Sequence, residues 1–207
     1  MGEVYLTARG VAAAMFEKAG IDSKMEFKLA HLGYFDAPAS KGHHLAERGG
    51  LLTHSLNVTN RLVKLGESLG VNWPRTESPY LIGMLHDLVK CRCYQMVDTN
   101  CPDKGYKYVQ PAYAGHGVCS IAIAIELGID LLPAEVVAIM YHMGAFGIGK
   151  EYTDKEFYAA MSNYAPYIIA THAADWYAAS VDEIDTNPVN PVNPVQTQTT
   201  NIQQEDK

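Results

Sequence analysis

Between residues 11 and 181 the chain is a succession of apolar segments with the period of an α-helix, and this pattern constrains the fold most. Val11, Met15 and Ala19 share one helical face, for example, and Gly20 follows as a stop signal. The class predicted by this periodicity is all-α. We expect helices over residues 11–19, 23–32, 51–69, 78–89, 117–127, 133–143 and 166–181.

Several of these segments carry a recognisable helix start. The signals are capping boxes, a capping serine and prolines at the first turn. The capping boxes are Ser23-x-x-Glu26 and Thr153-x-x-Glu156, the capping serine is Ser78 before Pro79, and the other first-turn prolines are Pro133 and Pro166. Residues 92–109 differ, because tyrosines and valines there flank a polar turn. This composition favours a small β-hairpin.

The overall charge excludes one class of partner. The chain of 207 residues has 16 Lys and Arg against 23 Asp and Glu, a formal net charge of −7. Binding of duplex nucleic acid depends on clustered basic residues, so we expect no such partner. No apolar stretch is long enough to span a bilayer and no signal peptide is recognisable, so we expect a cytoplasmic protein that does not engage membranes.

The composition changes near residue 186. Asn-Pro-Val units and then a polar Gln- and Thr-rich stretch occupy residues 186–207, with too few apolar side chains to form a core. We therefore predict a folded unit over residues 1–185 and a flexible tail over 186–207. Within the folded unit, N-terminal helices over 1–33 precede a core over about 35–180.

Histidines and aspartates recur in or beside these apolar helices at intervals of 26 to 33 residues. Taken singly, a buried histidine is more often a hydrogen-bonded core residue than a ligand. An unpaired polar group inside an apolar helix is costly, however, and a metal ion is one partner that offsets the cost. Imidazole and carboxylate suit zinc, iron, nickel and manganese. The candidate ligands are His54, His86, Asp87, His116, His142 and Asp175.

This ordered set resembles the HD-domain superfamily, which is named for its His-Asp dipeptide, over about residues 35–180. The segment 38–54 looks like the start of bacterial HD-type 3′-to-5′ exoribonucleases, and segments 85–90, 115–117 and 141–144 look like small bacterial and phage HD hydrolases. The resemblance implies an HD-domain helical bundle that holds two divalent metal ions, with Asp87 between them. It leaves the metal open among iron, manganese, nickel, zinc and magnesium.

The resemblance also implies a function. We expect a metal-dependent phosphohydrolase, either a monoesterase or a diesterase, that acts on a nucleotide or another small phosphoester. Two ions would present hydroxide to phosphorus, and Asp87 and Lys90 are the expected catalytic residues. Two alternatives stay open: a di-iron oxygenase of the same superfamily, and a catalytically idle nucleotide-binding module. The oligomeric state is open.

Residues around the ligand set are candidates for contact with the substrate phosphate or leaving group. Lys90 follows His86 by four residues on the same helical face, although a lysine at a helix end also binds terminal carbonyls. The loop histidines have an alternative interpretation as solvent-exposed residues, and the histidine near Asp175 has one as a packing residue. The candidates are Lys90, His43, His44, Arg48 and His172.

Overall fold

The computed structural model describes residues 2–97, 105–111, 115–144 and 153–184, and it confirms the all-α class with one small hairpin. The predicted tail over 186–207 lies outside the described residues. The elements are α1 Gly2–Lys18, α2 Ser23–Leu32, α3 Gly50–Ser68, α4 Ser78–Leu85, α5 Lys90–Cys93, β1 Tyr94–Met96, β2 Tyr106–Tyr108, α6 His116–Leu127, α7 Pro133–Met140, α8 Asp154–Tyr177 and the π-helical turn η2 Ala178–Asp182. The two strands pair antiparallel.

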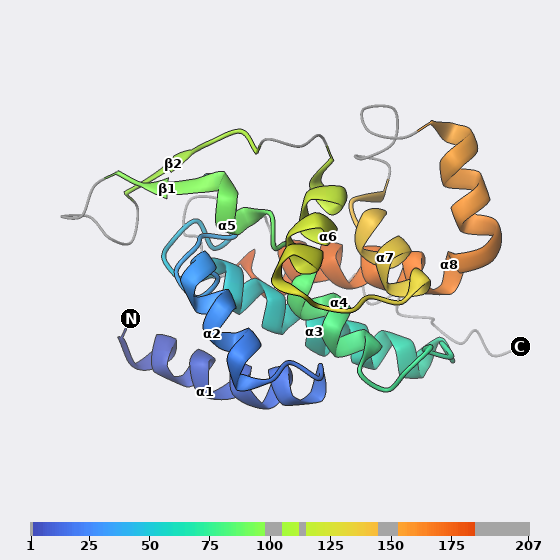
Figure 1. The fold of residues 1–207 in the computed structure, drawn as a ribbon, viewed down its shortest axis with the longest axis horizontal. Helices are drawn as coiled ribbons and strands as arrows, with labels where there is room; N and C mark the ends of the chain where they lie inside the picture. The colour runs from blue at the N-terminus through green and yellow to red at the C-terminus, as the bar shows by residue number, and fades with distance from the viewer. Residues whose placement is uncertain (1, 98–104, 112–114, 145–152, 185–207) are drawn as a thin grey trace, which may run out of the picture.

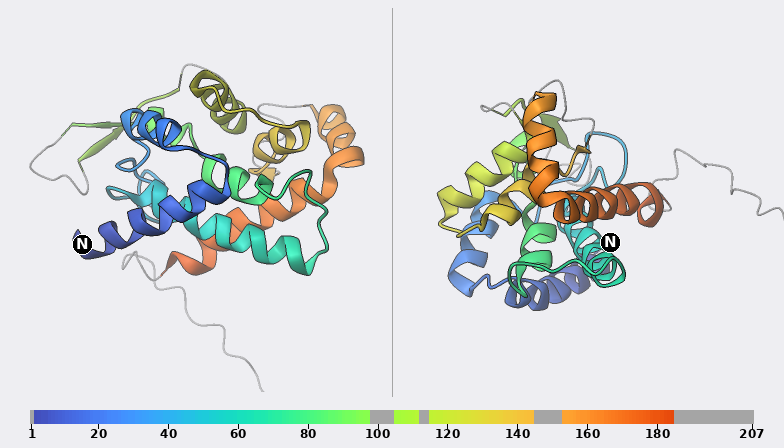
Figure 2. Two further views of the ribbon diagram at one scale, coloured as in Figure 1. Left: turned by 60° about the horizontal axis from the view of Figure 1, so that its bottom comes forward. Right: turned by 90° about the vertical axis from the view of Figure 1, so that its right-hand side faces the viewer.

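Helix α3 is the centre of the arrangement (Figure 1). It packs against α4 and α8 and also contacts α1 and η2. In the left view of Figure 2, α1 and α3 lie along one side of the molecule, and α6 and α7 lie along the other. Helices α4 and α7 also contact each other, so α4 links the two sides.

Two glycines let the helices that carry the candidate ligands approach closely. A Cβ atom at Gly83 of α4 would lie 2.4 Å from Thr59 Oγ1 of α3. A Cβ atom at Gly117 of α6 would lie 2.5 Å from the Ile139 carbonyl oxygen of α7. Because no real side chain fits at such distances, these two glycines set the separation of the helices around the site.

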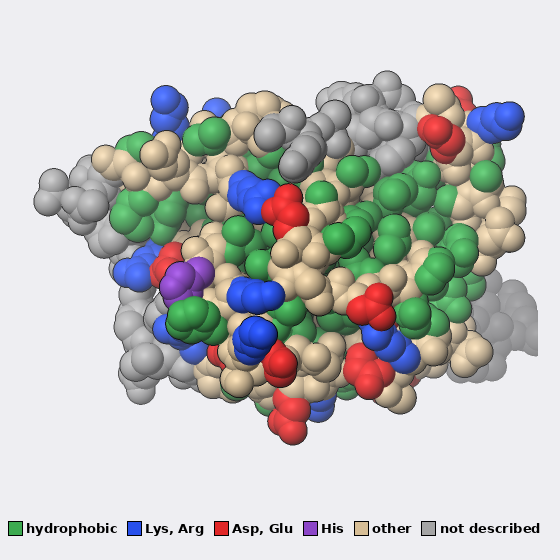
Figure 3. All heavy atoms as spheres, viewed as in Figure 1, with side chains coloured by type: hydrophobic (Ala, Val, Ile, Leu, Met, Phe, Trp, Pro, Cys, Tyr) green, Lys and Arg blue, Asp and Glu red, His purple; other side chains and the backbone are tan. Residues whose placement is uncertain are grey.

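Hydrophobic side chains fill two clusters, one mainly between α1, α2, α3, α4 and α6 and one mainly between α3, α7 and α8. Exposed hydrophobic side chains also gather on the surface near α7 and α8 (Figure 3). None of the described helices combines the length and the apolar character that a bilayer span needs.

Two of the predicted helix caps are wrong. The cap of α2 is Asp22, whose Oδ1 accepts from the Met25 amide at 2.7 Å, rather than Ser23, which is already helical. Ser78 does not cap α4, because its hydroxyl donates instead to the buried Glu135 carboxylate at 2.7 Å. The capping box at Thr153 is confirmed.

Helix α8 also differs from the prediction. Pro166, which was expected to open a helix, lies inside a helix that begins at Asp154. Figure 1 shows α8 changing direction along its length. A proline inside a helix removes one backbone hydrogen bond and bends the helix rather than ending it when neighbouring turns pack well.

Two helices end sooner than predicted, and both do so at candidate ligands. Helix α4 ends at Leu85 rather than at residue 89, and α7 ends at Met140 rather than at residue 143. The chain continues in tight turns, in which the Leu88 amide donates to the Leu85 carbonyl and the Gly144 amide to that of Tyr141. These turns carry His86, Asp87 and His142 toward the interior.

Candidate metal centre

The six predicted ligands come together at the ends and inner faces of five helices. His54 lies within α3, His86 caps the end of α4 and Asp87 follows it, His116 is the first residue of α6, His142 follows α7, and Asp175 lies near the end of α8. Four of them are buried: His54, His86, Asp87 and His142. The side chains of His116 and Asp175 are 24 % and 18 % exposed to solvent. These two residues therefore mark the side on which the cluster meets solvent.

The carboxylate of Asp87 lies between two pairs of imidazoles. Its Oδ2 atom faces Nε2 of His54 at 3.7 Å and Nε2 of His86 at 3.6 Å. Its Oδ1 atom contacts Nε2 of His116 and lies 3.5 Å from Nε2 of His142. Each carboxylate oxygen therefore has its own pair of ring nitrogens.

Asp175 lies closest to the first of these pairs. Its Oδ1 atom lies 3.1 Å from Nε2 of His54 and 3.8 Å from Nε2 of His86. Ligands about 2.1 Å from one ion lie roughly 3.0–3.6 Å from one another, so these separations are close to those of a coordination sphere.

Hydrogen bonds orient the buried imidazoles. Nδ1 of His86 donates to the Gly83 carbonyl at 2.9 Å, and Nδ1 of His142 donates to the Ile139 carbonyl at 2.6 Å. A neutral imidazole that donates through Nδ1 carries its lone pair on Nε2. The Nε2 atom of His142 is buried and has no hydrogen-bond partner, and buried polar atoms without partners are rare in proteins. A metal ion satisfies such an atom, so the residues fit a metal.

The electrostatics of the cluster favour a positive charge between the imidazoles. The Nε2 atoms of His54 and His86 face each other at 3.3 Å, which brings two lone pairs together unless a proton or a cation separates them. Burial alone would lower the pKa of His54, but hydrogen bonds to Asp175 and Glu183 outweigh it and raise the pKa to about 10. Burial lowers the pKa of His86 to about 4. One proton on His54 therefore occupies the position that a cation would take.

The two aspartates are held in the charged form. Burial opposes ionisation of Asp87, but the charge of Lys90 and the interactions with His86 and His116 hold its pKa well below the ordinary value. Burial likewise opposes ionisation of Asp175, but the hydrogen bond from His54 and the nearby histidines lower its pKa. Two carboxylates that stay ionised in a buried site are suitable ligands for a divalent cation.

The buried His and Asp groups could therefore hold a metal ion. Among the described residues, four sets of three ligand atoms lie within 4.8 Å of one another. Three sets consist of predicted ligands, His54–His86–Asp87, His86–His142–Asp175 and Asp87–His116–His142, and the fourth is His44–His54–Glu183.

Lys90 lies at the edge of the cluster. Its Nζ atom donates to the Ala39 carbonyl and lies 3.6 Å from Asp87 Oδ2, and its side chain is 17 % exposed. The carbonyl it binds lies in the loop between α2 and α3 and is not a terminal carbonyl of a helix, and the ammonium brings positive charge next to the candidate ligand Asp87.

The other candidate substrate contacts differ in how close they lie to the six candidate ligands. His44 lies against the cluster, with its ring 5.1 Å from that of His54. His172 donates through Nδ1 to the His142 carbonyl at 2.7 Å and packs on Gly144, so it supports the turn that carries His142. Arg48 pairs with Asp36 at 2.6 Å, in a partly exposed ion pair rather than in the cluster.

His43, the remaining candidate, is exposed, and its backbone amide donates to Ser40 Oγ. The structure therefore brings two of the five predicted contacts, Lys90 and His44, next to the ligand set. His172 contacts the ligand set through its hydrogen bond to the backbone carbonyl of His142.

Sequence reasoning missed one residue of the cluster, Glu183. This carboxylate is 1 % exposed and accepts hydrogen bonds from Nδ1 of His44, Nδ1 of His54 and the Asn57 amide. Burial alone would raise the pKa of Glu183, but the hydrogen bonds from His44 and His54 lower it to about 2. The one signal in the sequence was an acidic pair, Asp182-Glu183, directly after an apolar helix.

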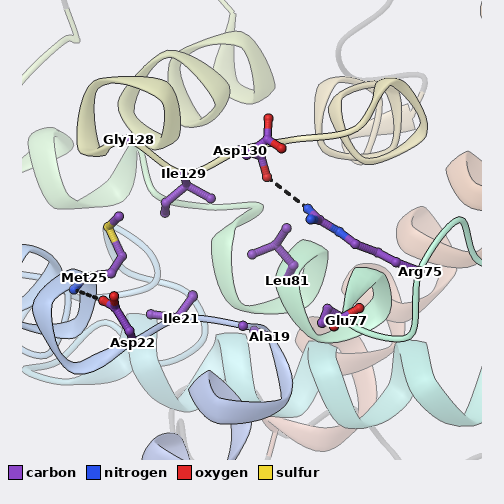
Figure 4. A pocket seen from close by; sticks show the side chains of 11 residues that line it. Ala19, Ile21, Asp22, Met25, Arg75, Glu77, Leu81, Gly128, Ile129 and Asp130 are labelled. Carbon is purple, nitrogen blue, oxygen red and sulfur yellow. Dashed lines mark hydrogen bonds between the residues drawn. The ribbon is translucent and has the colours of Figure 1, made fainter.

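A cavity of about 300 Å³ lies elsewhere, between the turn after α1, the start of α4 and the turn after α6 (Figure 4). Asp22, Glu77 and Asp130 are among the residues that line it, and none of the six candidate ligands does. Its arginine, Arg75, is already bound to the Asp130 carbonyl and to Glu135. The cavity therefore offers no unused cationic group, and the His/Asp cluster is the better candidate site.

Comparison with protein-family models, with curated proteins and with solved structures finds no match to this chain. The resemblance to the HD-domain superfamily therefore rests on the residues themselves. What the structure adds is their convergence: residues that span more than 120 positions of the sequence meet in one partly buried cluster suited to a metal ion.

Proposed function

We propose that this protein is a metal-dependent phosphohydrolase that acts on a nucleotide or another small phosphoester. The observation that supports the proposal most is the position of Asp87, whose two carboxylate oxygens each face a separate pair of histidine Nε2 atoms. A carboxylate so placed is suited to bridge two cations, and two-metal sites recur in phosphatases and nucleases.

The residues divide into two ligand groups. His54, His86, Asp87 and Asp175 would hold the first ion, and Asp87, His116 and His142 would hold the second. A divalent ion in such a site lowers the pKa of bound water and polarises a phosphoryl oxygen. The first group supplies four ligands and the second three, so a six-coordinate ion in either group would keep positions for water and substrate.

The chain's own residues supply the rest of the site. His116 and Asp175 lie on the solvent side, so a small substrate would enter there. Lys90, fixed by the Ala39 carbonyl, places an ammonium beside Asp87 and offsets negative charge that a phosphoryl group brings. His44 lies next to the first ligand group, which makes it the better placed of the two loop histidines to protonate a leaving oxygen.

Metal analysis of the purified protein, joined to a substrate panel, tests the proposal. Nucleoside mono-, di- and cyclic phosphates should be assayed with added manganese, iron, nickel and magnesium. We expect bound metal and hydrolysis of at least one phosphoester, and both should disappear in Asp87→Asn. The matched control is Asp22→Asn, because asparagine caps a helix as well as aspartate does and Asp22 lies outside the cluster.

Three results would contradict the proposal. A wild-type protein that binds none of these metals would remove its basis. Bound iron with oxygen consumption and no phosphoester hydrolysis would instead favour the di-iron oxygenase. Metal binding without either activity would favour the idle nucleotide-binding module.

A further inference from the structure

Glu183 lies beyond every helix that carries a candidate ligand, yet its carboxylate is buried against the cluster. It follows η2, the π-helical turn Ala178–Asp182 at the end of α8, and its backbone amide donates to the Ala178 carbonyl. A π-helical turn contains one more residue than an α-helical one and often occurs at functional sites. Here the turn brings a residue beyond the end of the helix back onto α3.

One face of α3 receives this segment. His54, Asn57 and Arg61 are spaced three and four residues apart, so they lie on the same side of the helix. Arg61 binds Asp182 through Nε and Nη2, while His54 and Asn57 bind the neighbouring Glu183. The two adjacent acidic residues thus have different partners, and only Glu183 touches the candidate metal centre.

The other partner of Glu183 comes from the loop between α2 and α3. This loop is closed by hydrogen bonds from Ser40 Oγ to the His44 carbonyl and from the Ala39 amide to the Leu45 carbonyl. Leu45 adopts a positive φ of 45°, which is unusual for a residue other than glycine and shows that the loop is held in a defined shape. In this shape Nδ1 of His44 reaches the second oxygen of Glu183.

The contact to His54 has a direct consequence for a metal ligand. An ionised carboxylate only accepts hydrogen bonds, so Nδ1 of His54 must carry the hydrogen that Glu183 binds at 3.0 Å. The lone pair of the neutral ring then lies on Nε2, which is the nitrogen that faces Asp175, His86 and Asp87. His86 and His142 achieve the same orientation with backbone carbonyls.

We propose that Glu183 is the positioning residue of the metal centre: it fixes the tautomer and ring orientation of His54 and joins the His44 loop to α3 and the end of α8. The inference rests on the proposed function to the extent that it requires a cation at His54. Carboxylates that bind the outer nitrogen of a ligand histidine typically change metal affinity 10- to 100-fold when removed.

The test is the affinity of the metal-free protein for Mn²⁺ and Co²⁺, measured by calorimetry and by the Co²⁺ absorption spectrum, in Glu183→Ala. We expect binding that is about 10- to 100-fold weaker and an altered spectrum. Glu183→Gln should fall between alanine and wild type, because one amide oxygen can still accept from His54 but its NH₂ group cannot accept from His44. The matched control, Asp182→Ala, removes the adjacent carboxylate and should retain wild-type affinity.

An alanine variant that binds both metals as tightly as wild type, with an unchanged spectrum, would overturn the inference. If that variant does not fold, the nitrogen chemical shifts of His54 in the Zn²⁺-loaded wild type decide the question. A hydrogen on Nδ1 and metal on Nε2 support the inference, and metal on Nδ1 refutes it. A wild-type protein that binds no metal would refute the proposed function instead, so the two failures are distinguishable.

Discussion

Two buried groups of polar side chains lie at opposite ends of α4. They differ in how far the chain itself supplies hydrogen bonds and opposite charges to the buried carboxylate of each group. At the start of the helix, the Glu135 carboxylate accepts from Arg75 at 2.7 and 2.6 Å, from Ser78 at 2.7 Å and from the Leu132 amide at 2.8 Å. At the end of the helix, the carboxylate of Asp87 and the lone pairs of the imidazoles face one another, and one buried nitrogen has no partner.

The difference separates a structural network from a binding site. The chain supplies Glu135 with a guanidinium that forms two hydrogen bonds, so the network is complete without a ligand. Around Asp87 the nearest lysine stays 3.6 Å away, and part of the compensating charge comes from protons on histidines. Substitutions in the first group should therefore reduce the stability of the fold, and substitutions in the second should reduce metal binding.

Asp87→Ala should have the largest effect on the second group. Because each oxygen of this carboxylate faces a different histidine pair, its loss should disturb every bound ion and reduce hydrolysis to the background of the assay. Metal content and turnover, measured with circular dichroism as a check on folding, provide the readout. Retention of full metal content would show that Asp87 is not shared between the two histidine pairs.

Glu135→Ala should have the largest effect on the first group. It leaves the Arg75 charge and the Ser78 hydroxyl without their partner, and breaking a buried ion pair of this kind costs about 3 kcal/mol of unfolding free energy. The metal content of the folded fraction should not change. Glu126→Ala removes the exposed pair with Arg92 and should leave the unfolding free energy nearly unchanged in the same denaturation experiment.

Equal losses in these two variants would contradict the distinction between a buried structural network and an exposed ion pair. A parallel loss of metal in the Glu135→Ala variant would show that the two ends of α4 are coupled rather than separate.

Replacing His116 and His142 together by alanine should remove one ion and leave the other. Both residues face Oδ1 of Asp87, whereas His54 and His86 face Oδ2. Metal stoichiometry in protein saturated with manganese is the measurement, and His31→Ala, a change at an exposed histidine of α2, is the control. A wild-type stoichiometry of one ion per chain would refute the two-metal arrangement.

The sequence was sufficient to predict the helical class and the six residues of the cluster. Helix periodicity is a local property, and a His-Asp pair inside an apolar helix is conspicuous because burial of such groups requires a partner. Their convergence is a tertiary property, and a common partner for polar residues on several apolar helices is one arrangement that satisfies them. The predicted ligand set is therefore the part of the site that sequence reasoning reached.

Residues whose role depends on a distant partner escaped prediction. Ser78 resembles a helix cap, yet Glu135, which lies 57 positions away, binds its hydroxyl. Glu183 follows the last apolar helix as one of two acidic residues, and only the turn of η2 and the contact with α3 bury one of them. Pro166 was misassigned because the capping box at Thr153 starts the helix earlier and the helix continues through the proline.

The pH dependence of the unfolding free energy provides a further test of the His/Asp cluster, with a smaller expected effect than the substitutions above. Burial lowers the pKa of His86 to about 4, so between about pH 6.5 and pH 4 the unfolded chain binds a proton at this residue and the folded chain does not. The unfolding free energy of the metal-free protein should therefore fall as the pH falls through this window.

Other shifted groups do not cancel this effect. The raised pKa of His54 adds stability that is complete below about pH 6.5, and the lowered pKa of Glu183 acts only below its ordinary value. Chemical denaturation at several pH values, with His86→Asn as the comparison, is the measurement. We expect a shallower slope in the variant, and identical slopes would assign the dependence to other groups.

Deletion of residues 187–207 should have the smallest effect of all. These residues carry too few apolar side chains to pack a core, so the melting temperature and the metal content should stay nearly unchanged. A deletion that starts at residue 183 differs by only four further positions but removes the carboxylate that binds His44 and His54. It should weaken metal binding as Glu183→Ala does, because both changes leave Nδ1 of His54 without its acceptor. A loss of several degrees on deleting 187–207 alone would instead show that the tail packs on the folded unit.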